Sequence, residues 1–124
     1  MSLILIVEDN EKNLKLVRDV LQVKGYKTLE AGTAEDGIKL AGEHMPDLIL
    51  MDIHLPGMNG IDALRVLRSD AATAAIPVIA VTASVMQQDR KLITDAGFDG
   101  YVGKPINLKE FLDAVRDMLA KHNQ

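Results

Sequence analysis

Short apolar runs alternate along this chain with longer segments in which apolar residues recur every three or four positions. Residues 3–7, 48–51 and 78–81 are uninterrupted apolar runs, as required of strands buried on both faces of a parallel sheet. Residues 27–31 are more polar, as expected of a strand near a sheet edge, and residues 100–103 form the last candidate strand. The pattern therefore predicts five short strands.

A segment with helical spacing follows each predicted strand. Asn10 and Thr33 stand where N-caps are expected, and Asp36 completes a capping box with Thr33. The predicted helices run from residue 11 to the stop at Gly25, from Thr33 to about residue 44, through residues 61–67, from 85 to 96, and onward from the Asn107 cap. Residues 70–75 contain no apolar anchor, so we expect them to connect elements rather than to pack.

Five strand–helix repeats predict an α/β fold in which a five-stranded parallel sheet carries helices on both faces. Because the strands are parallel and their helical connections are right-handed, the carboxyl ends of all the strands lie along one edge of the sheet. A chain of 124 residues, 48% of them hydrophobic, is long enough for one core and too short for two. We therefore expect residues 1–124 to form a single domain with no effector domain.

Composition argues against several functions. No apolar stretch approaches the roughly 20 residues of a membrane span, and the amino terminus does not resemble a signal peptide, so we expect a cytoplasmic protein with no membrane partner. The absence of cysteine excludes disulfides and thiolate chemistry. A net charge of -4 without a basic cluster argues against nucleic acid as a partner. Any output is expected to pass through proteins.

Polar residues of chemical interest follow four of the five predicted strands. Glu8 and Asp9 follow the first strand, Asp52 the third, Thr82 the fourth and Lys104 the fifth. Ligands bind at this edge in open α/β sheets. Asp also opens turns, but turn chemistry alone does not select three carboxylates, a hydroxyl and an ammonium. The sequence therefore predicts a polar site at the carboxyl edge of the sheet.

Three crowded carboxylates repel one another unless a cation neutralises them, and oxygen ligands without cysteine suit Mg²⁺. We expect Asp9 and Asp52 to touch the ion. Glu8, which is one carbon longer than an aspartate, is expected to hold a coordinated water, and His54 to offer its backbone carbonyl. The sequence thus predicts a divalent metal site.

Lys104 and Thr82 suit a phosphoryl group, because one supplies a point charge and the other a hydroxyl donor for its oxygens. Asp52 is the predicted nucleophile. Its carboxylate attacks phosphorus in line and forms a 4-aspartylphosphate, while the metal and the lysine balance charge on the equatorial oxygens.

Together these residues resemble the response-regulator receiver domains of two-component signalling. The motifs that carry the resemblance are Val7-Glu8-Asp9-Asn10, Asp52 followed by Leu55-Pro56-Gly57-Met58-Asn59-Gly60, Thr82-Ala83 and Lys104-Pro105. The resemblance covers the whole chain and implies a CheY-like, flavodoxin-like (βα)5 fold with strand order 2-1-3-4-5. It also implies a phosphorelay in which a histidine kinase or histidine phosphotransfer protein phosphorylates Asp52 with Mg²⁺, for which Mn²⁺ can substitute.

The resemblance further implies a switch. In such domains the lysine–proline bond, here Lys104–Pro105, is cis. Thr82 moves toward the phosphoryl group, and Tyr101 moves from exposed to buried. These movements remodel the face made by the fourth helix, fifth strand and fifth helix, where a downstream protein target binds.

By the same resemblance, the only chemistry of the chain is its own phosphorylation and autodephosphorylation at Asp52, and it is not otherwise an enzyme. His54 and Ser84 occupy positions that tune how fast the phosphoryl group is lost in this family. The implied oligomeric state is a monomer or a weak, phosphorylation-dependent dimer.

Several alternatives remain open. The Glu8-Asp9-Asn10 pattern with Asn13 is similar to stand-alone receivers of the DivK type, although receivers of hybrid histidine kinases or multidomain regulators share the signature. A haloacid-dehalogenase-type phosphatase also uses a strand-end aspartate and Mg²⁺, but it needs an acid–base aspartate where this chain has His54. A flavodoxin-like electron carrier needs a phosphate-binding first loop, whereas residues 8–11 are mainly acidic.

Overall fold

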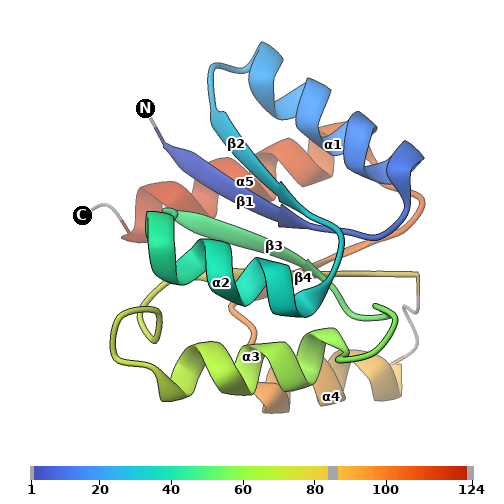
Figure 1. Cartoon of the computed structure of the whole chain (residues 1–124). Helices are drawn as coiled ribbons and strands as arrows, with labels where there is room; N and C mark the ends of the chain where they lie inside the picture. The colour runs from blue at the N-terminus through green and yellow to red at the C-terminus, as the bar shows by residue number, and fades with distance from the viewer. Residues whose placement is uncertain (1, 84–86, 123–124) are drawn as a thin grey trace.

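The chain folds into a parallel sheet that lies between two layers of helices (Figure 1). The computed structural model describes residues 2–83 and 87–122. The strands in this part are β1 (Leu3–Val7), β2 (Lys27–Ala31), β3 (Leu48–Asp52), β4 (Val78–Thr82) and β5 (Gly100–Gly103). The helices are α1 (Glu11–Val23), α2 (Ala34–His44), α3 (Gly60–Ser69), α4 (Gln87–Ala96) and α5 (Leu108–His122). The strand order is β2-β1-β3-β4-β5 with parallel pairs throughout, so the predicted α/β fold is confirmed.

Successive residues of the central strands face opposite helical layers, which explains their uninterrupted apolar runs. Figure 1 shows α1 and α5 on one face of the sheet and α2, α3 and α4 on the other. Ile4 and Ile6 of β1 share a buried cluster with Phe111 of α5, whereas Leu5 and Val7 belong to the cluster on the opposite face. Because both faces are covered, each position of β1 from its second residue on is buried.

Side chains cap the helices where the sequence predicts N-caps. Asn10, Thr33 and Asn107 each accept a hydrogen bond from the backbone amide three residues later, at 3.1 Å. The structure describes α4 from residue 87, and the predicted residues 85 and 86 of this helix lie outside the described residues. No helix in the described ranges combines the length and the apolar character needed to cross a membrane.

The connection between α3 and β4 differs from its prediction in one respect. Residues 70–75 form turns, as expected, but they also pack against the protein. Thr73 is buried, and its hydroxyl donates to the carbonyl oxygen of Leu67 at 2.7 Å. Arg68 Nη1 donates to the carbonyl oxygens of Ala74 and Ile76 at 3.0 and 2.6 Å. Hydrogen bonds hold this segment against the protein, so the expectation that it connects elements without packing was wrong.

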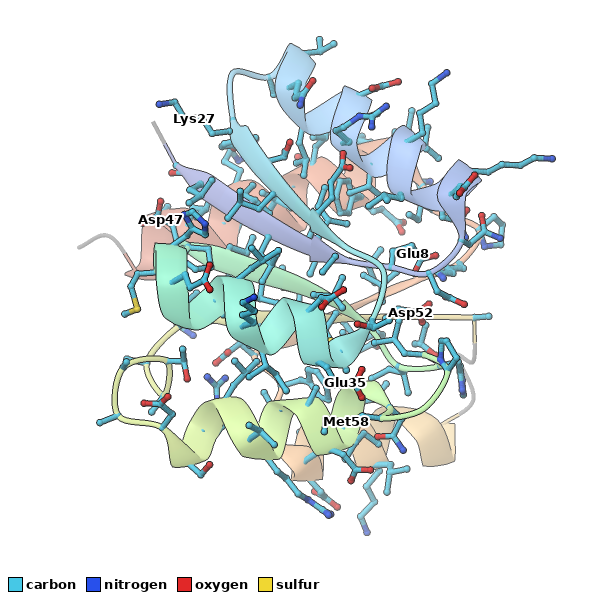
Figure 2. All side chains as sticks on the ribbon, in the orientation of Figure 1. Glu8, Lys27, Glu35, Asp47, Asp52 and Met58 are labelled. Carbon is cyan, nitrogen blue, oxygen red and sulfur yellow. The ribbon has the colours of Figure 1, made fainter. Side chains whose placement is uncertain are left out.

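The register of the sheet aligns the ends of neighbouring strands. Asp52, the last residue of β3, pairs with Val81 of β4, and Thr82 pairs with Gly103 of β5. Figure 2 shows Glu8, which directly follows β1, at the same end of the molecule as Asp52. Residues far apart in the chain therefore meet at the carboxyl edge of the sheet.

Candidate functional site

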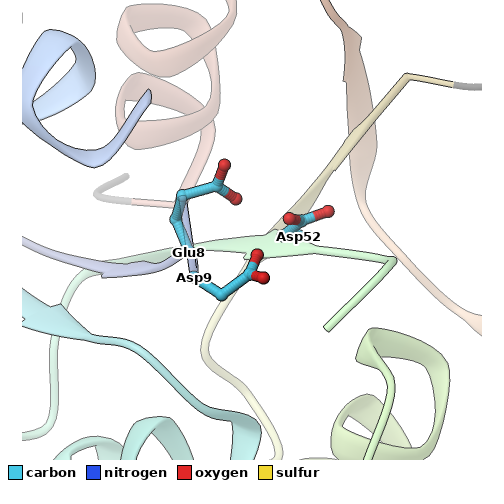
Figure 3. Close-up of side chains that lie close together, drawn as sticks. All are labelled: Glu8, Asp9 and Asp52. Carbon is cyan, nitrogen blue, oxygen red and sulfur yellow. The ribbon is translucent and has the colours of Figure 1, made fainter. Parts of the chain in front are cut away.

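Three carboxylates from two strand ends form one cluster, shown in Figure 3. One oxygen atom from each of Glu8, Asp9 and Asp52 lies within 4.8 Å of the other two. Glu8 and Asp52 are buried, with 5% and 4% of their surfaces exposed, whereas Asp9 is exposed. The cluster thus has two carboxylates buried at the carboxyl edge of the sheet and one at the protein surface.

The ammonium of Lys104 bridges the two buried carboxylates. Its Nζ lies 2.8 Å from Glu8 Oε1 and 3.2 Å from Asp52 Oδ2, and the lysine side chain is only 17% exposed. The backbone amide of Lys104 donates to the carbonyl oxygen of Thr82 at 2.8 Å, which ties the exit of β5 to β4. With one cation among three acids, the cluster retains a net negative charge that favours a divalent cation when the acids are ionised.

Two further groups hold the carboxylates in place. Asn13 Nδ2 donates to Glu8 Oε1 at 3.1 Å, and the backbone amide of His54 donates to Asp52 Oδ1 at 3.1 Å. The contact of Asn13 with Glu8 was not predicted from the sequence, in which Asn13 is only part of a motif. Asn13 lies in the first turn of α1, which begins three residues after Glu8.

Burial and neighbouring groups set different proton affinities for the buried acids. Burial raises the pKa of Glu8 to about 7, and Asp52 adds to the rise while Lys104 and Asn13 oppose it. Burial also disfavours ionised Asp52, but hydrogen bonds from the Glu8 side chain and the His54 amide, together with the lysine charge, lower its pKa. Burial acts against the charge of Lys104 as well, yet the two acids raise its pKa. Of the two buried acids, Glu8 therefore holds a proton more readily, and Asp52 carries the negative charge.

An open cleft of about 650 Å³ lies beside the cluster. Asp9, His54 and Thr82 provide polar groups in its wall, and Leu55 and Ile93 are among its apolar neighbours. Thr82 is 2% exposed, so its side chain lies at the base of the cleft rather than on the outer surface. A ligand of moderate size in this cleft would contact Asp9, the exposed carboxylate of the cluster.

Of the other residues singled out by the sequence, the structure describes Tyr101, Pro105 and His54. Tyr101 of β5 is 39% exposed, and the Lys104–Pro105 peptide bond is cis. His54 is exposed on the wall of the cleft. Ser84 lies outside the described residues. The roles predicted for these positions stay predictions.

The donor set fits a hard divalent cation. Glu8, Asp9 and Asp52 offer carboxylate oxygens that approach one another closely, and burial together with the neighbouring Asp52 raises the pKa of Glu8. No thiolate ligand is available, since the chain has no cysteine. The chemistry of these residues therefore supports divalent metal binding.

A family model and individual sequence relatives assign the chain to the same protein family. The family model described as the response regulator receiver domain matches residues 4–116. The polar-differentiation response regulator DivK of Brucella ovis is 42% identical over 116 residues, which are 94% of this chain and 94% of that protein.

Solved structures agree with the sequence relatives. The CheY-like response regulator receiver domain protein of Methanospirillum hungatei JF-1 has a TM-score of 0.90 and 28% identity, covering 99% of this chain and 97% of that one. The receiver domain of the sensor histidine kinase PA1611 from Pseudomonas aeruginosa PAO1 has a TM-score of 0.89 and 30% identity, covering 96% and 98%, and it holds a magnesium ion in its active site cleft. The chain, with its acidic cluster beside a lysine, therefore belongs to the response regulator receiver domains of two-component signalling and has a DivK-like sequence.

Proposed function

We propose that the chain is a phosphorelay regulator in which Asp52 accepts a phosphoryl group from a phosphohistidine of a sensor kinase or a histidine phosphotransfer protein. One observation carries this proposal. Asp52 is a buried carboxylate that accepts hydrogen bonds from Lys104 Nζ and from the His54 amide at the carboxyl edge of the sheet.

Asp52 suits the nucleophilic role better than the two other acids of the cluster. Its pKa is lowered, so the carboxylate is ionised at neutral pH. Glu8 has a pKa of about 7 and is partly protonated there. Asp9 is exposed, and no lysine contacts it in the described residues. Only Asp52 combines ionisation with a cation placed to meet the incoming phosphoryl oxygens.

In the proposed transfer, an Asp52 oxygen attacks phosphorus as the bond from phosphorus to the donor imidazole nitrogen breaks. The electron pair of that bond stays on the imidazole, which takes a proton from solvent. Lys104 moves toward an equatorial phosphoryl oxygen, and the Thr82 hydroxyl donates to another. The product is an acyl phosphate on Asp52, and hydrolysis by water restores the carboxylate.

We further propose Mg²⁺ as the cofactor, with Mn²⁺ able to substitute. Asp9 and Asp52 would hold the ion together with the His54 backbone carbonyl, and Glu8 would hold one of its waters. When bound, the ion supplies charge neutralisation for the reacting oxygens. The magnesium ion in the cleft of the related PA1611 receiver supports this choice.

The proposed output is a change of protein surface. Thr82 and Lys104 turn toward the phosphoryl group, and Tyr101, now 39% exposed, becomes buried. The face formed by α4, β5 and α5 then binds a downstream protein. His54 and Ser84 tune the lifetime of the phosphoryl group. We propose a cytoplasmic monomer or weak, phosphorylation-dependent dimer.

The testing experiment is intact-mass spectrometry after incubation with acetyl phosphate, in Mg²⁺ or in EDTA. We expect a single Mg²⁺-dependent phosphoryl adduct on the wild type and none on Asp52→Asn. Asp62→Asn is the matched control, because Asp62 is exposed on α3 and, among the described residues, its side chain forms only a surface ion pair. An equal adduct on Asp52→Asn would overturn the assignment of the acceptor.

A further inference from the structure

Asn13 shares its acceptor with the lysine of the site. Asn13 Nδ2 donates to Glu8 Oε1 at 3.1 Å, and Lys104 Nζ donates to the same oxygen at 2.8 Å. Among the described residues, no other side-chain nitrogen donates to this carboxylate. Glu8 is buried, so loss of either donor leaves a poorly satisfied polar group.

The position of Asn13 is fixed independently of Lys104. Its backbone amide donates to Asn10 Oδ1 at 3.1 Å, which caps α1. At this helical position a side chain commonly turns back to the backbone amide of the cap. Here the side chain of Asn13 bonds to Glu8 instead. A capped helix therefore presents one donor to the carboxylate, while the flexible lysine presents the other.

We propose that Asn13 is a positioning residue that keeps Glu8 in place when Lys104 leaves it for the phosphoryl group on Asp52. The inference rests on the proposed phosphorylation of Asp52. While Asn13 is present, the transfer of Lys104 leaves Oε1 with one donor. Both nitrogen donors use Oε1, so once Glu8 is ionised and no longer donates to Asp52, Oε2 is the oxygen that remains for a water of the bound cation. Asn13 thereby fixes Glu8 for metal binding and lowers the barrier to the movement of Lys104.

Replacement of Asn13 by alanine isolates this contact. The variant keeps the backbone amide that bonds to the Asn10 cap, and alanine is the stronger helix former, so helix propensity predicts no loss. A hydrogen bond to an ionised group is large enough for us to expect about tenfold weaker Mg²⁺ binding by calorimetry and about tenfold slower phosphorylation by acetyl phosphate at saturating Mg²⁺. Lys12→Ala, at an exposed position of the same turn, is the control and should leave both values unchanged.

A double-mutant cycle with Glu8→Ala distinguishes positioning from a general structural effect. The effect of Asn13→Ala on Mg²⁺ affinity, and on the free energy of unfolding in EDTA, should vanish when residue 8 is alanine. An equal effect in both backgrounds would show that Asn13 does not act through Glu8 and would overturn the inference. Wild-type values in Asn13→Ala would overturn it as well. If the wild type itself forms no adduct, the proposed function fails instead, and the cycle in EDTA still decides whether Asn13 positions Glu8.

Discussion

Lys104 Nζ lies 2.8 Å from Glu8 Oε1, although 96 positions separate the two residues in the chain. This ion pair joins the exit of β1 to the exit of β5 across the carboxyl edge of the sheet. In the absence of a metal ion, the lysine compensates the repulsion between the two buried acids. The proposed mechanism needs Lys104 to leave this pair, so the same contact stabilises the resting state and opposes the switch.

Removal of the lysine charge should therefore destabilise the metal-free protein. We expect Lys104→Ala to lower the free energy of unfolding in EDTA by about 2 kcal/mol, because two buried acids lose their cation. Mg²⁺ should restore much of this loss by binding the more negative site. Urea unfolding followed by circular dichroism measures both values.

Lys109→Ala is the control for this variant. Lys109 is exposed in the first turn of α5 and forms no ion pair in the described structure, so its removal should change the unfolding free energy little. Equal stability of Lys104→Ala and wild type in EDTA would contradict the bridging role of Lys104.

Metal binding should release a proton. Glu8 has a pKa of about 7 in the metal-free protein, and a cation beside it favours the ionised form. We therefore expect proton release to be larger at pH 6 than at pH 8, because Glu8 is already ionised at the higher pH. Calorimetric titrations with Mg²⁺ in two buffers of different ionisation enthalpy measure this release. Glu8→Gln should bind Mg²⁺ without proton release, and release of the same size in that variant would assign the proton to another group.

The same raised pKa gives a stability prediction whose sign is fixed. The pKa of Glu8 is about 7 in the folded state and 4.5 in the reference state, so the native protein binds more protons between these values. The stabilising contribution of the protonated group is therefore present below pH 4.5 and is lost as the pH rises to 7. In EDTA, the wild type should therefore lose stability relative to Glu8→Gln as the pH rises from 4.5 to 7, because only the wild type has an acid that must ionise at residue 8. A difference in stability that does not vary with pH would contradict the pKa of Glu8.

Much of this arrangement follows from the apolar pattern, because position in a parallel sheet is encoded locally. The run at 48–51 predicts a strand buried on both faces, and Asp52 directly after it must lie at the carboxyl edge. The contact between Asn13 and Glu8 was not predicted, since it depends on the angle at which α1 leaves its cap. The burial of Thr73 was missed because hydrogen bonds to backbone carbonyls leave no periodic signal in a sequence.

Gly60 lies against the backbone of the proposed acceptor and should not tolerate a side chain. A Cβ atom at Gly60 would lie 2.5 Å from the carbonyl oxygen of Asp52 and 3.0 Å from Ile53 Cα. Backbone atoms cannot yield as a flexible side chain does, so Gly60→Ala must displace the start of α3 or the end of β3. We expect a loss of about 2 kcal/mol in stability, together with slower phosphorylation.

Gly42→Ala provides the matched comparison for this substitution. Gly42 lies within α2, and a Cβ atom there has no neighbour within 4 Å. Alanine should therefore stabilise the protein by up to about 1 kcal/mol through helix propensity. Thermal unfolding of the two variants should move in opposite directions, and equal stability of Gly60→Ala and wild type would contradict the close approach to Asp52.

The network around Arg68 should support the fold without taking part in the chemistry. Arg68 Nη2 lies 2.8 Å from Asp99 Oδ2, and the same oxygen accepts the backbone amide of Val78 at 2.8 Å. Arg68 Nη1 also donates to two carbonyl oxygens of the turn after α3, as described above. These bonds join α3 to the start of β4, at the end of the strand away from Thr82.

We expect Arg68→Ala to lower the unfolding free energy by about 2 to 3 kcal/mol, because several acceptors lose a charged donor at once. Arg65→Ala is the control: its side chain is 74% exposed and, in the described part of the chain, makes only a 3.6 Å ion pair with Asp62, so the change should be within about 0.5 kcal/mol. At a temperature where Arg68→Ala remains folded, acetyl phosphate should phosphorylate it at the wild-type rate. A large loss of rate in the folded variant would show that this network reaches the site, since no described contact joins Arg68 to the carboxyl edge.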